Sequence, residues 1–197
     1  MTKSFAPAYD RNKHAILAVL QEILPRNGVV LEVGSGTGQH AMYFAQNLPH
    51  ITWIPSDRAG EIDSIEAWRA ESGLANLRAP LEIDLYDEAW PVESVDAIVC
   101  INVVHIAPWT ATEKLFITAT GVLRSGGLMY LYGPYRYATR PLEPSNEAFD
   151  QWLKARDADS GIRDFESLNE LAGNASFQLL GDRSMPANNR SLWWRKT

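Results

Sequence analysis

The chain has 197 residues, of which 46% are apolar and 21% charged, so it can bury one domain-sized core and does not have the composition of a disordered polypeptide. Its 18 basic and 24 acidic residues give a formal net charge of −6, which disfavours binding to a nucleic-acid backbone or an anionic membrane. The single cysteine excludes an intramolecular disulfide and a multi-cysteine zinc site, so a reducing compartment is permitted.

The chain is expected to begin with an amphipathic helix over residues 11–24. Apolar residues recur there at helical spacing, and Pro25 and Gly28 stop the helix. Its most apolar stretch, 15–20, is too short to span a membrane, and no small-residue cleavage site accompanies it. We therefore expect a soluble, cytoplasmic protein with neither a signal peptide nor a membrane segment.

From residue 29 onward, strand patterns alternate with helix patterns. Short β-branched or apolar runs predict strands, and longer periodic runs predict helices. Two S/T/D-x-x-E patterns, at 63–66 and 110–113, are interpreted as helix capping pairs. The expected strands are 29–33, 51–54, 81–83, 95–101, 128–132, 177–180 and 191–195, and the expected helices between them are 40–48, 63–71, 110–123, 145–155 and 164–172.

This alternation predicts an α/β fold. Strands joined through helices imply right-handed crossovers and a mostly parallel sheet with helices on both faces. We expect one domain over 1–197, because no repeat or linker divides the chain. One segment, 133–163, is longer than the alternation needs. Long excursions of this kind are commonly lids or binding loops, so substrate contacts are expected there.

The most informative turn follows the first strand and reads G-S-G-T-G at residues 34–38, with Glu32 inside the strand. Ligands of open α/β sheets bind beyond the carboxyl ends of the strands, and glycines there remove side chains that would block a ligand. The dinucleotide fingerprint G-x-G-x-x-G fails, because its last position is Gln39. The alternative is a tight strand-to-helix turn that binds nothing.

Two further acids follow expected strands. Asp57 comes about 20 residues after the glycine turn, the spacing typical of an acid that accepts ribose hydroxyls. Asp84 follows the third strand in an acidic loop, 84–88. Each has a structural alternative, which is a helix N-cap or a solvated loop residue for Asp57 and a solvated loop residue for Asp84.

Glu32 with the glycine turn resembles motif I of the class I S-adenosylmethionine-dependent methyltransferases. The whole chain is similar to a small family of methyltransferase-like proteins long carried as a domain of unknown function. This resemblance implies a Rossmann-like class I methyltransferase fold, with a mostly parallel seven-stranded sheet and an antiparallel last strand, and S-adenosylmethionine as cofactor. It supplies no substrate. The strings that carry it are 11–13, 101–109, 132–135, 145–150 and 185–189.

The resemblance also implies where the cofactor binds. The glycine turn approaches the amino-acid and ribose part, Asp57 the ribose hydroxyls, and Asp84 with the backbone of Leu85 the adenine. Asn102, after the fourth strand, is a candidate to position the cofactor amine or the acceptor. The expected cofactor-binding residues are Glu32, Gly34, Ser35, Gly36, Gly38, Asp57, Asp84, Leu85 and Asn102.

Methyl transfer needs a positioned nucleophile, exclusion of water and, for some acceptors, a base. His105, after the fourth strand, is the candidate base, because imidazole titrates near neutrality; the alternative is a histidine that packs in the loop. Tyr135 is the second catalytic candidate. No histidine stands at a metal-ligand spacing with a carboxylate, so no metal is expected. The expected substrate-binding residues are Arg136, Asn146 and Asn189.

Alternation also predicts where several buried side chains point. Tyr130 and Tyr132 share one face of the fifth strand, and only the later tyrosines are expected to reach the pocket. Trp193 and Trp194 are expected on opposite faces of the last strand, and Cys100 inside the fourth.

The leading hypothesis is an S-adenosylmethionine-dependent methyltransferase that acts on a small molecule. Residues 102–105 read N-V-V-H, whereas nucleic-acid amino methyltransferases resemble N-P-P-Y or D-P-P-Y there, so no nucleic-acid substrate is expected. Two alternatives stay open: a non-catalytic cofactor-binding module, and another transferase on the same fold, for example one that moves an aminopropyl group. The residues indicate neither the acceptor atom nor the oligomeric state.

Overall fold

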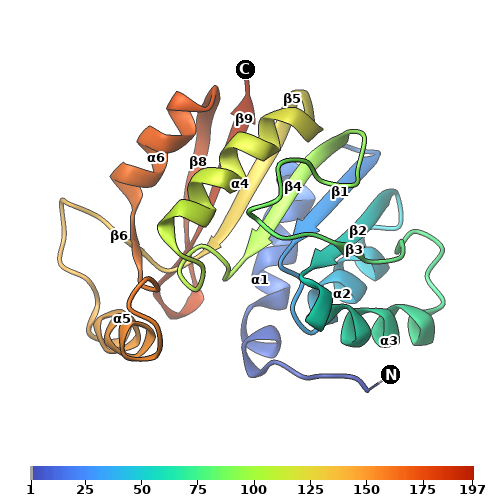
Figure 1. Cartoon of the computed structure of the whole chain (residues 1–197), viewed down its shortest axis with the longest axis horizontal. Coiled ribbons are helices and arrows are strands. Elements are labelled where there is room, and N and C mark those ends of the chain that lie inside the picture. The colour runs from blue at the N-terminus through green and yellow to red at the C-terminus, as the bar shows by residue number, and fades with distance from the viewer. Residues whose placement is uncertain (1) are drawn as a thin grey trace.

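A computed structural model describes residues 2–197 and shows helices on both faces of a central sheet (Figure 1). The strands are β1 (Gly28–Val33), β2 (Ile51–Asp57), β3 (Leu81–Glu82), β4 (Val95–Ile101), β5 (Leu123–Gly133), β6 (Tyr135–Arg136), β7 (Arg163–Asp164), β8 (Phe177–Met185) and β9 (Asn189–Lys196). The helices are α1 (Pro7–Ile23), α2 (Gln39–Asn47), α3 (Ile62–Ser72), α4 (Trp109–Val122), α5 (Pro144–Arg156) and α6 (Phe165–Asn174), with short 3-10 turns η1 (Ala59–Glu61) and η2 (Pro186–Asn188).

The sheet has seven strands in the order β3-β2-β1-β4-β5-β9-β8. In this order, each of β3, β2, β1, β4 and β5 runs parallel to the next, and β9 runs antiparallel to both β5 and β8. The predicted α/β class is confirmed, including the mostly parallel seven-stranded sheet and the antiparallel last strand. The order reverses beside β1, and a crevice for a ligand opens at such a point.

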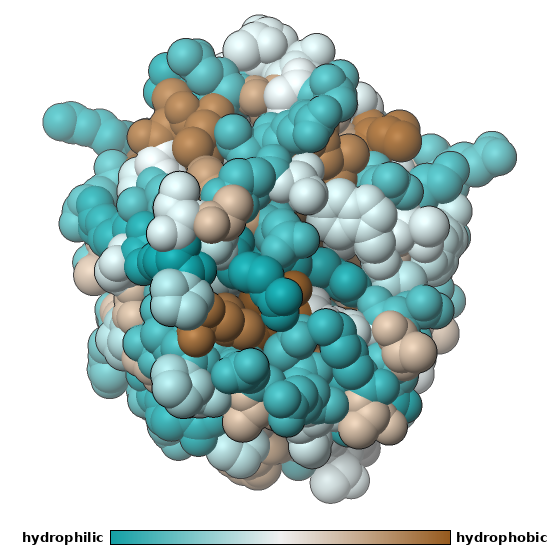
Figure 2. Space-filling view, turned by 90° about the vertical axis from the view of Figure 1, so that its left-hand side faces the viewer, coloured by the Kyte–Doolittle hydropathy of each residue, from teal (hydrophilic) through white to brown (hydrophobic). Residues whose placement is uncertain are grey.

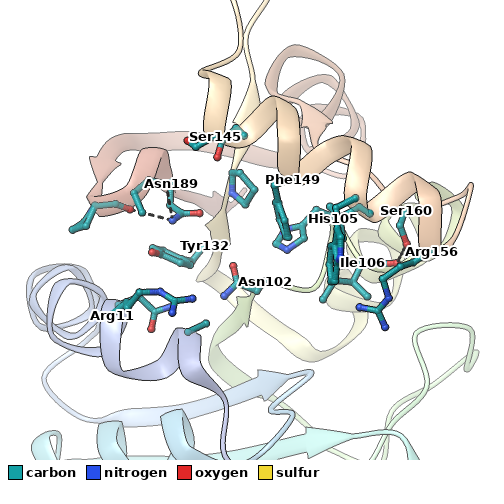
Figure 3. Close-up of a pocket in the computed structure, with 18 of the residues that line it drawn as sticks. Arg11, Asn102, His105, Ile106, Tyr132, Ser145, Phe149, Arg156, Ser160 and Asn189 are labelled. Carbon is teal, nitrogen blue, oxygen red and sulfur yellow. Dashed lines mark hydrogen bonds between the residues drawn. The ribbon is translucent and has the colours of Figure 1, made fainter.

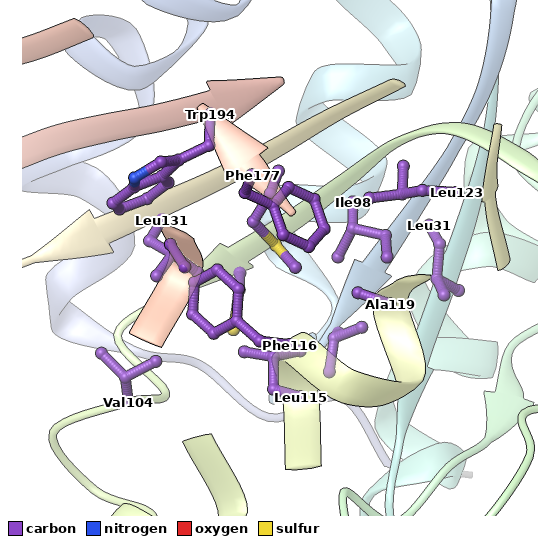
Figure 4. Packing of buried hydrophobic residues seen from close by; sticks show 14 of the residues in the cluster. Leu31, Ile98, Val104, Leu115, Phe116, Ala119, Leu123, Leu131, Phe177 and Trp194 are labelled. Atoms are coloured by element: carbon purple, nitrogen blue, oxygen red, sulfur yellow. The ribbon is translucent and has the colours of Figure 1, made fainter. Parts of the chain in front are cut away.

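Both faces of the sheet are apolar because both are covered by helices. On the face covered by α4 and α6, Phe116 meets Phe177 and Trp194 edge to face, at centroid distances of 5.6 and 5.9 Å (Figure 4). The opposite face packs against α1 and α2. Trp193 and Trp194 lie on opposite faces and Cys100 is buried, as expected.

Several elements extend beyond their expected bounds, including β5, β8 and β9, and the reason is visible for α1 and β2. Helix α1 begins at Pro7, because proline fits the first turn of a helix, where its missing N–H breaks no helical hydrogen bond. The N–H of Ala6, just before the helix, donates to Gln39 Oε1 at 2.7 Å. Strand β2 continues through Pro55 to Asp57. Because β3 pairs only with the last two residues of β2, Pro55 interrupts no hydrogen bond to that strand.

The two predicted capping pairs are wrong. Helix α3 begins at Ile62, so Asp63 lies inside its first turn, and neither α3 nor α4 has a side-chain cap. Pro108 is the residue before α4. The two side chains of the predicted capping pair there form hydrogen bonds to other groups. Thr110 Oγ1 pairs with the Tyr86 hydroxyl at 2.8 Å, and Glu113 Oε1 accepts from the indole N–H of Trp109 at 3.1 Å.

The long excursion contains structure that the sequence did not indicate. Strands β6 and β7 form a separate two-stranded parallel sheet, which brackets α5. Helix α5 lies beside the carboxyl ends of β4 and β5, at the lower left of Figure 1. The side of the molecule that carries α5 and α6 is mostly hydrophilic, and apolar side chains reach it in small separate patches (Figure 2).

None of the helices within residues 2–197 combines the length and the apolarity needed to cross a membrane.

Candidate functional site

Two cavities adjoin each other beyond the carboxyl ends of the parallel strands. The first, of about 640 Å³, lies over the glycine turn, and we name it the turn cavity. The second, of about 770 Å³, lies under α5, and we name it the α5 cavity (Figure 3). The two share four lining residues and therefore meet there: Ala8, Asn102, Ile106 and Asp157.

The three glycines of the turn all have left-handed backbone angles, with φ of +73°, +54° and +86° at Gly34, Gly36 and Gly38. A Cβ on Gly34 would lie 2.5 Å from Val103 Cγ2, and one on Gly38 would lie 2.7 Å from Ile65 Cα. A Cβ on Gly36 would meet nothing within 4 Å. Gly34 and Gly38 thus allow close packing, whereas Gly36 keeps the floor of the turn cavity open.

Asp57 holds the glycine turn in place. Its Oδ2 accepts from the N–H of Gly36 at 2.7 Å, and the N–H groups of Gly34 and Ser35 both donate to the carbonyl of Ser56 at 2.9 Å. A carboxylate has about four acceptor positions, so Asp57, which lines the turn cavity, retains capacity for a ligand. The bond to Gly36 shows that Asp57 is not merely a solvated loop residue.

Glu32 is only 1% exposed and also lines the turn cavity. Burial raises the pKa of Glu32 to about 7; the hydrogen bonds from Trp53 and Ser35 oppose the rise, and the charge of Asp57 adds to it. The indole N–H of Trp53 donates to Glu32 Oε2 at 2.9 Å. The carboxyl group therefore changes its protonation state near neutral pH.

We expect Glu32→Gln to flatten the pH dependence of stability between about pH 4.5 and 7. The folded-state pKa lies above the unfolded one, so the contribution of Glu32 is complete below the unfolded pKa and declines as pH rises to about 7. Between pH 5 and pH 8, the native chain should lose on the order of 2 kcal/mol more free energy of unfolding than the variant. Urea unfolding at both pH values measures this difference. The exposed control Glu88→Gln should follow the native curve. Parallel curves for Glu32→Gln and the native chain would contradict this assignment.

The expected adenine end of the turn cavity is a folded loop. Asp84 Oδ1 accepts from the N–H of Tyr86 at 2.9 Å, and the N–H of Asp84 donates to Asp87 Oδ2 at 2.9 Å. Asp84 and Leu85 both line the cavity. The cofactor-site candidates Glu32, Gly34, Ser35, Gly36, Asp57, Asp84, Leu85 and Asn102 all line the turn cavity, and Gly38 stands just behind it at the start of α2.

His105 lines the α5 cavity and is 2% exposed. Its ring meets the edge of Phe149 at 5.5 Å, and its Nδ1 has no partner among the described residues. Burial, with the charge of Arg163, lowers the pKa of His105 to about 4, so the imidazole is neutral at physiological pH. A Cβ at Gly133 would lie 3.1 Å from Nδ1, so the glycine at that position leaves room for the ring.

The loop that carries His105 is held by the end of the excursion. All four carbonyls of residues 104–107 accept hydrogen bonds from residues 160–163, and we name this set the carbonyl clamp. Its bonds run from Arg163 Nε to Val104 at 2.8 Å, from the N–H of Gly161 to His105 at 2.9 Å, from Ser160 Oγ to Ile106 at 2.6 Å, and from Arg163 Nη2 to Ala107. The backbone under His105 is therefore fixed by a segment more than fifty residues further along the chain.

Tyr135 and Arg136, expected at the acceptor site, line neither cavity. Tyr135 is buried in the core on the α4 and α6 face, where Leu131 also packs, whereas Tyr132 lies on the opposite face. Burial raises the pKa of Tyr135 well above its usual value. Arg136 Nη2 instead donates to Asp150 Oδ2 at 3.2 Å and ties β6 to α5. The structure thus corrects both assignments.

Tyr132 corrects the expectation that only the later tyrosines reach the pocket. It shares a face with Tyr130, as predicted, yet it lines the α5 cavity, whereas Tyr130 is buried and pairs with Ser191 Oγ at 2.7 Å. The expected substrate residues Asn146 and Asn189 do line this cavity. Asn146 Nδ2 donates to the carbonyl of Asn188 at 3.0 Å, which ties α5 to the η2 turn.

Sequence reasoning missed several residues of the α5 cavity. The string 11–13, which was noted without a role, supplies Arg11 and Asn12, and the end of β5 supplies Tyr132. Phe149 and Trp152 come from α5, whose spacing alone indicates a surface helix. Across residues 2–197, no three His, Cys, Asp or Glu side chains are grouped so that they could hold a metal. The missed residues are Arg11, Asn12, Tyr132, Phe149 and Trp152.

Comparison with known proteins places this geometry in a family. Residues 3–196 match the family model described as Protein of unknown function (DUF938). The O-methyltransferase pgmB of Aspergillus terreus is 31% identical over 105 residues, which are 52% of this chain and 29% of that protein. The chain thus covers less than a third of that relative.

Solved structures share the fold. The pyocyanin biosynthetic protein PhzM superposes with a TM-score of 0.79 at 16% identity, covering 96% of this chain and 56% of that one. CalO1, a methyltransferase in calicheamicin biosynthesis solved in its SAH-bound form, gives 0.75 at 16% identity, again covering 96% and 56%. The chain spans about half the length of these proteins and has the class I methyltransferase fold.

Proposed function

The chain belongs to the DUF938 family, and we propose that it is an S-adenosylmethionine-dependent methyltransferase that acts on a small molecule in the cytoplasm. The observation that carries this proposal is the turn cavity, whose floor stays open at Gly36 and which joins a second cavity of acceptor size at Asn102. The similarity to pgmB supports it.

The residues around the turn cavity fit the cofactor. Five carboxyl groups line it against one arginine, Arg58, which suits a ligand with an ammonium and a sulfonium. Asp57 would accept from the ribose hydroxyls, and Asp84 with Leu85 would border the adenine. When bound, the cofactor supplies an electrophilic methyl group. The lining acids are Glu32, Asp57, Glu61, Asp84 and Asp157.

His105 is proposed as the base. With its pKa lowered to about 4, the imidazole does not titrate near neutrality as expected and would be a weak base. It would therefore take only a proton that becomes strongly acidic as the acceptor atom is methylated. The segment 133–163 is proposed as the acceptor-binding part of the domain, because α5 roofs that cavity.

Isothermal titration calorimetry with S-adenosylhomocysteine tests the proposed function directly. Binding by the native chain is expected, and no heat of binding at millimolar ligand would overturn the proposal. Binding without methyl transfer over a broad metabolite panel would favour the non-catalytic module instead. Equal affinity for S-adenosylmethionine and its decarboxylated form would favour aminopropyl transfer, because the carboxylate would then contribute nothing to binding.

For His105→Gln we expect S-adenosylhomocysteine affinity to stay within about twofold of the native value and turnover to fall about 100-fold or more. Turnover is measured as S-adenosylhomocysteine released in the presence of the metabolite panel. The exposed His50, which lines neither cavity, provides the control His50→Gln, which should turn over like the native chain. Unchanged turnover in His105→Gln would remove His105 from the mechanism.

A further inference from the structure

One end of the α5 cavity is lined by hydrogen-bond donors. Figure 3 shows Arg11, Tyr132 and Asn189 together at this end, with Phe149 and His105 toward the other. Asn12, next to Arg11 on α1, also lines the cavity. We name Arg11, Asn12 and Tyr132 the donor end; Asn189 lies beside them, but its Nδ2 donates to the carbonyls of Pro186 and Ala187 at 3.0 and 3.3 Å.

The guanidinium of Arg11 is free. Its neighbour Asp10 is engaged by Lys13, whose Nζ lies 2.6 Å from Asp10 Oδ1. Within residues 2–197, Arg11 has no hydrogen bond, ion pair or aromatic partner, although it lines a cavity. A guanidinium presents a planar fork of donors that matches the two oxygens of a carboxylate.

The uncharged hydroxyl of Tyr132 lies near the positive charge of Arg11. Burial raises the pKa of Tyr132 to about 12, while the amides of Asn12 and Asn189 and the charge of Arg11 oppose the rise. The phenol therefore keeps its proton at physiological pH and can donate to an anion. A cationic ligand would be repelled by Arg11 at this place.

The Asn12 amide is oriented by a histidine. Asn12 Oδ1 lies 2.8 Å from His40 Nε2, so the imidazole donates and the Asn12 NH₂ remains the group available to others. Burial lowers the pKa of His40 to about 4, which keeps the imidazole neutral. The donor end thus presents a cation, a hydroxyl and an amide NH₂, and none of these is a carboxylate.

The other part of the α5 cavity is aromatic. Phe149 stacks on Trp152 at 5.7 Å with an interplanar angle of 18°, and the guanidinium of Arg156 lies 4.6 Å from the Trp152 ring centroid. His105 meets Phe149 edge to face. The one carboxylate that lines the α5 cavity within the described chain, Asp157, lies at the junction with the turn cavity and accepts from the N–H of Asp159 at 3.0 Å.

We propose that the methyl acceptor is an aromatic acid, with its carboxylate bound at the donor end and its ring against Phe149. This inference rests on the proposed function, since it names the substrate class of the same site. Arg11 and Tyr132 favour a ligand that carries a negative charge. Phe149 and His105 favour a ligand with a flat ring.

Calorimetry on the chain saturated with S-adenosylhomocysteine tests the inference with three matched probes. These are 4-hydroxybenzoate, the neutral 4-hydroxybenzyl alcohol and the cationic 4-hydroxybenzylamine. The acid should bind at least about tenfold more tightly than the alcohol, as one charge-assisted pair provides, and the amine should bind most weakly. Arg11→Gln should bring the acid to the affinity of the alcohol.

Arg26→Gln is the matched control, because Arg26 is also exposed, follows the same helix and lines neither cavity. It should keep the preference for the acid. Absence of acid binding, equal binding of acid and alcohol, or an acid preference that survives in Arg11→Gln would each overturn the inference. Acid binding by a chain that does not bind S-adenosylhomocysteine would instead refute the proposed function and leave the anion site standing.

Discussion

Gly36→Val should weaken S-adenosylhomocysteine binding by at least about 100-fold, or about 2.7 kcal/mol. The added side chain would enter space that no other atom occupies within 4 Å, and this space is the floor of the turn cavity. The N–H that donates to Asp57 is retained, so the hydrogen bond between turn and second strand survives. Calorimetry measures the affinity, and urea unfolding measures the stability.

The chain offers a matched control in Gly73, at the end of α3. It also has a positive φ, +63°, and a Cβ there would likewise meet nothing within 4 Å. Gly73→Val should therefore lose a comparable amount of stability, about 1–2 kcal/mol from the left-handed backbone, and bind the ligand normally. Equal affinity in the two variants would refute the assignment of the turn cavity to the cofactor.

Arg163→Ala should destabilise the fold by about 3 kcal/mol, because it leaves the carbonyls of Val104 and Ala107 without their donor. Arg163 is partly buried and packs within the excursion, so water cannot freely replace it. The same change loosens the loop under His105, and turnover should fall together with stability. Urea unfolding and the S-adenosylhomocysteine release assay measure the two effects.

Arg183→Ala is the comparison for this variant. Arg183 pairs with Glu22 at 2.6 Å on the surface, and removal of such an exposed pair costs about 1 kcal/mol or less. Arg163→Lys should recover part of the stability, since an ammonium can reach one carbonyl and not both. If Arg163→Ala is no less stable than Arg183→Ala, the carbonyl clamp does not hold the loop.

The architecture follows from local patterns, which is why it was predictable. Apolar periodicity identified every strand of the main sheet, and the G-S-G-T-G turn at 34–38 identified the turn cavity, because strand, turn and helix are consecutive there. The capping pairs failed because a matching S/T/D-x-x-E pattern does not determine where a helix begins. Pro108 and the η1 turn set those starts instead.

The α5 cavity was harder to predict because its wall comes from segments far apart in the chain. Arg11 on α1, Tyr132 at the end of β5 and Phe149 on α5 share no sequence spacing, and only the tertiary fold brings them together. Tyr135 was assigned to the cavity because it follows a strand end. It lies instead on the same face of the sheet as Leu131, which is packed under α4 and α6, whereas the cavity is reached from the face of Tyr132.

The carbonyl clamp has a consequence for how this site can change. The loop 104–107 and the segment 160–163 meet through the loop's backbone carbonyls, so the carbonyl clamp does not depend on the loop's side chains but does depend on Ser160 and Arg163 as donors. Exchange of the excursion for one that admits another acceptor would displace His105 unless residues 160–163 were carried over unchanged. Within the excursion, diversification of acceptor choice is therefore confined to α5 and the turn before it, and a chimera joined between Arg156 and Ser160 is the natural unit of exchange.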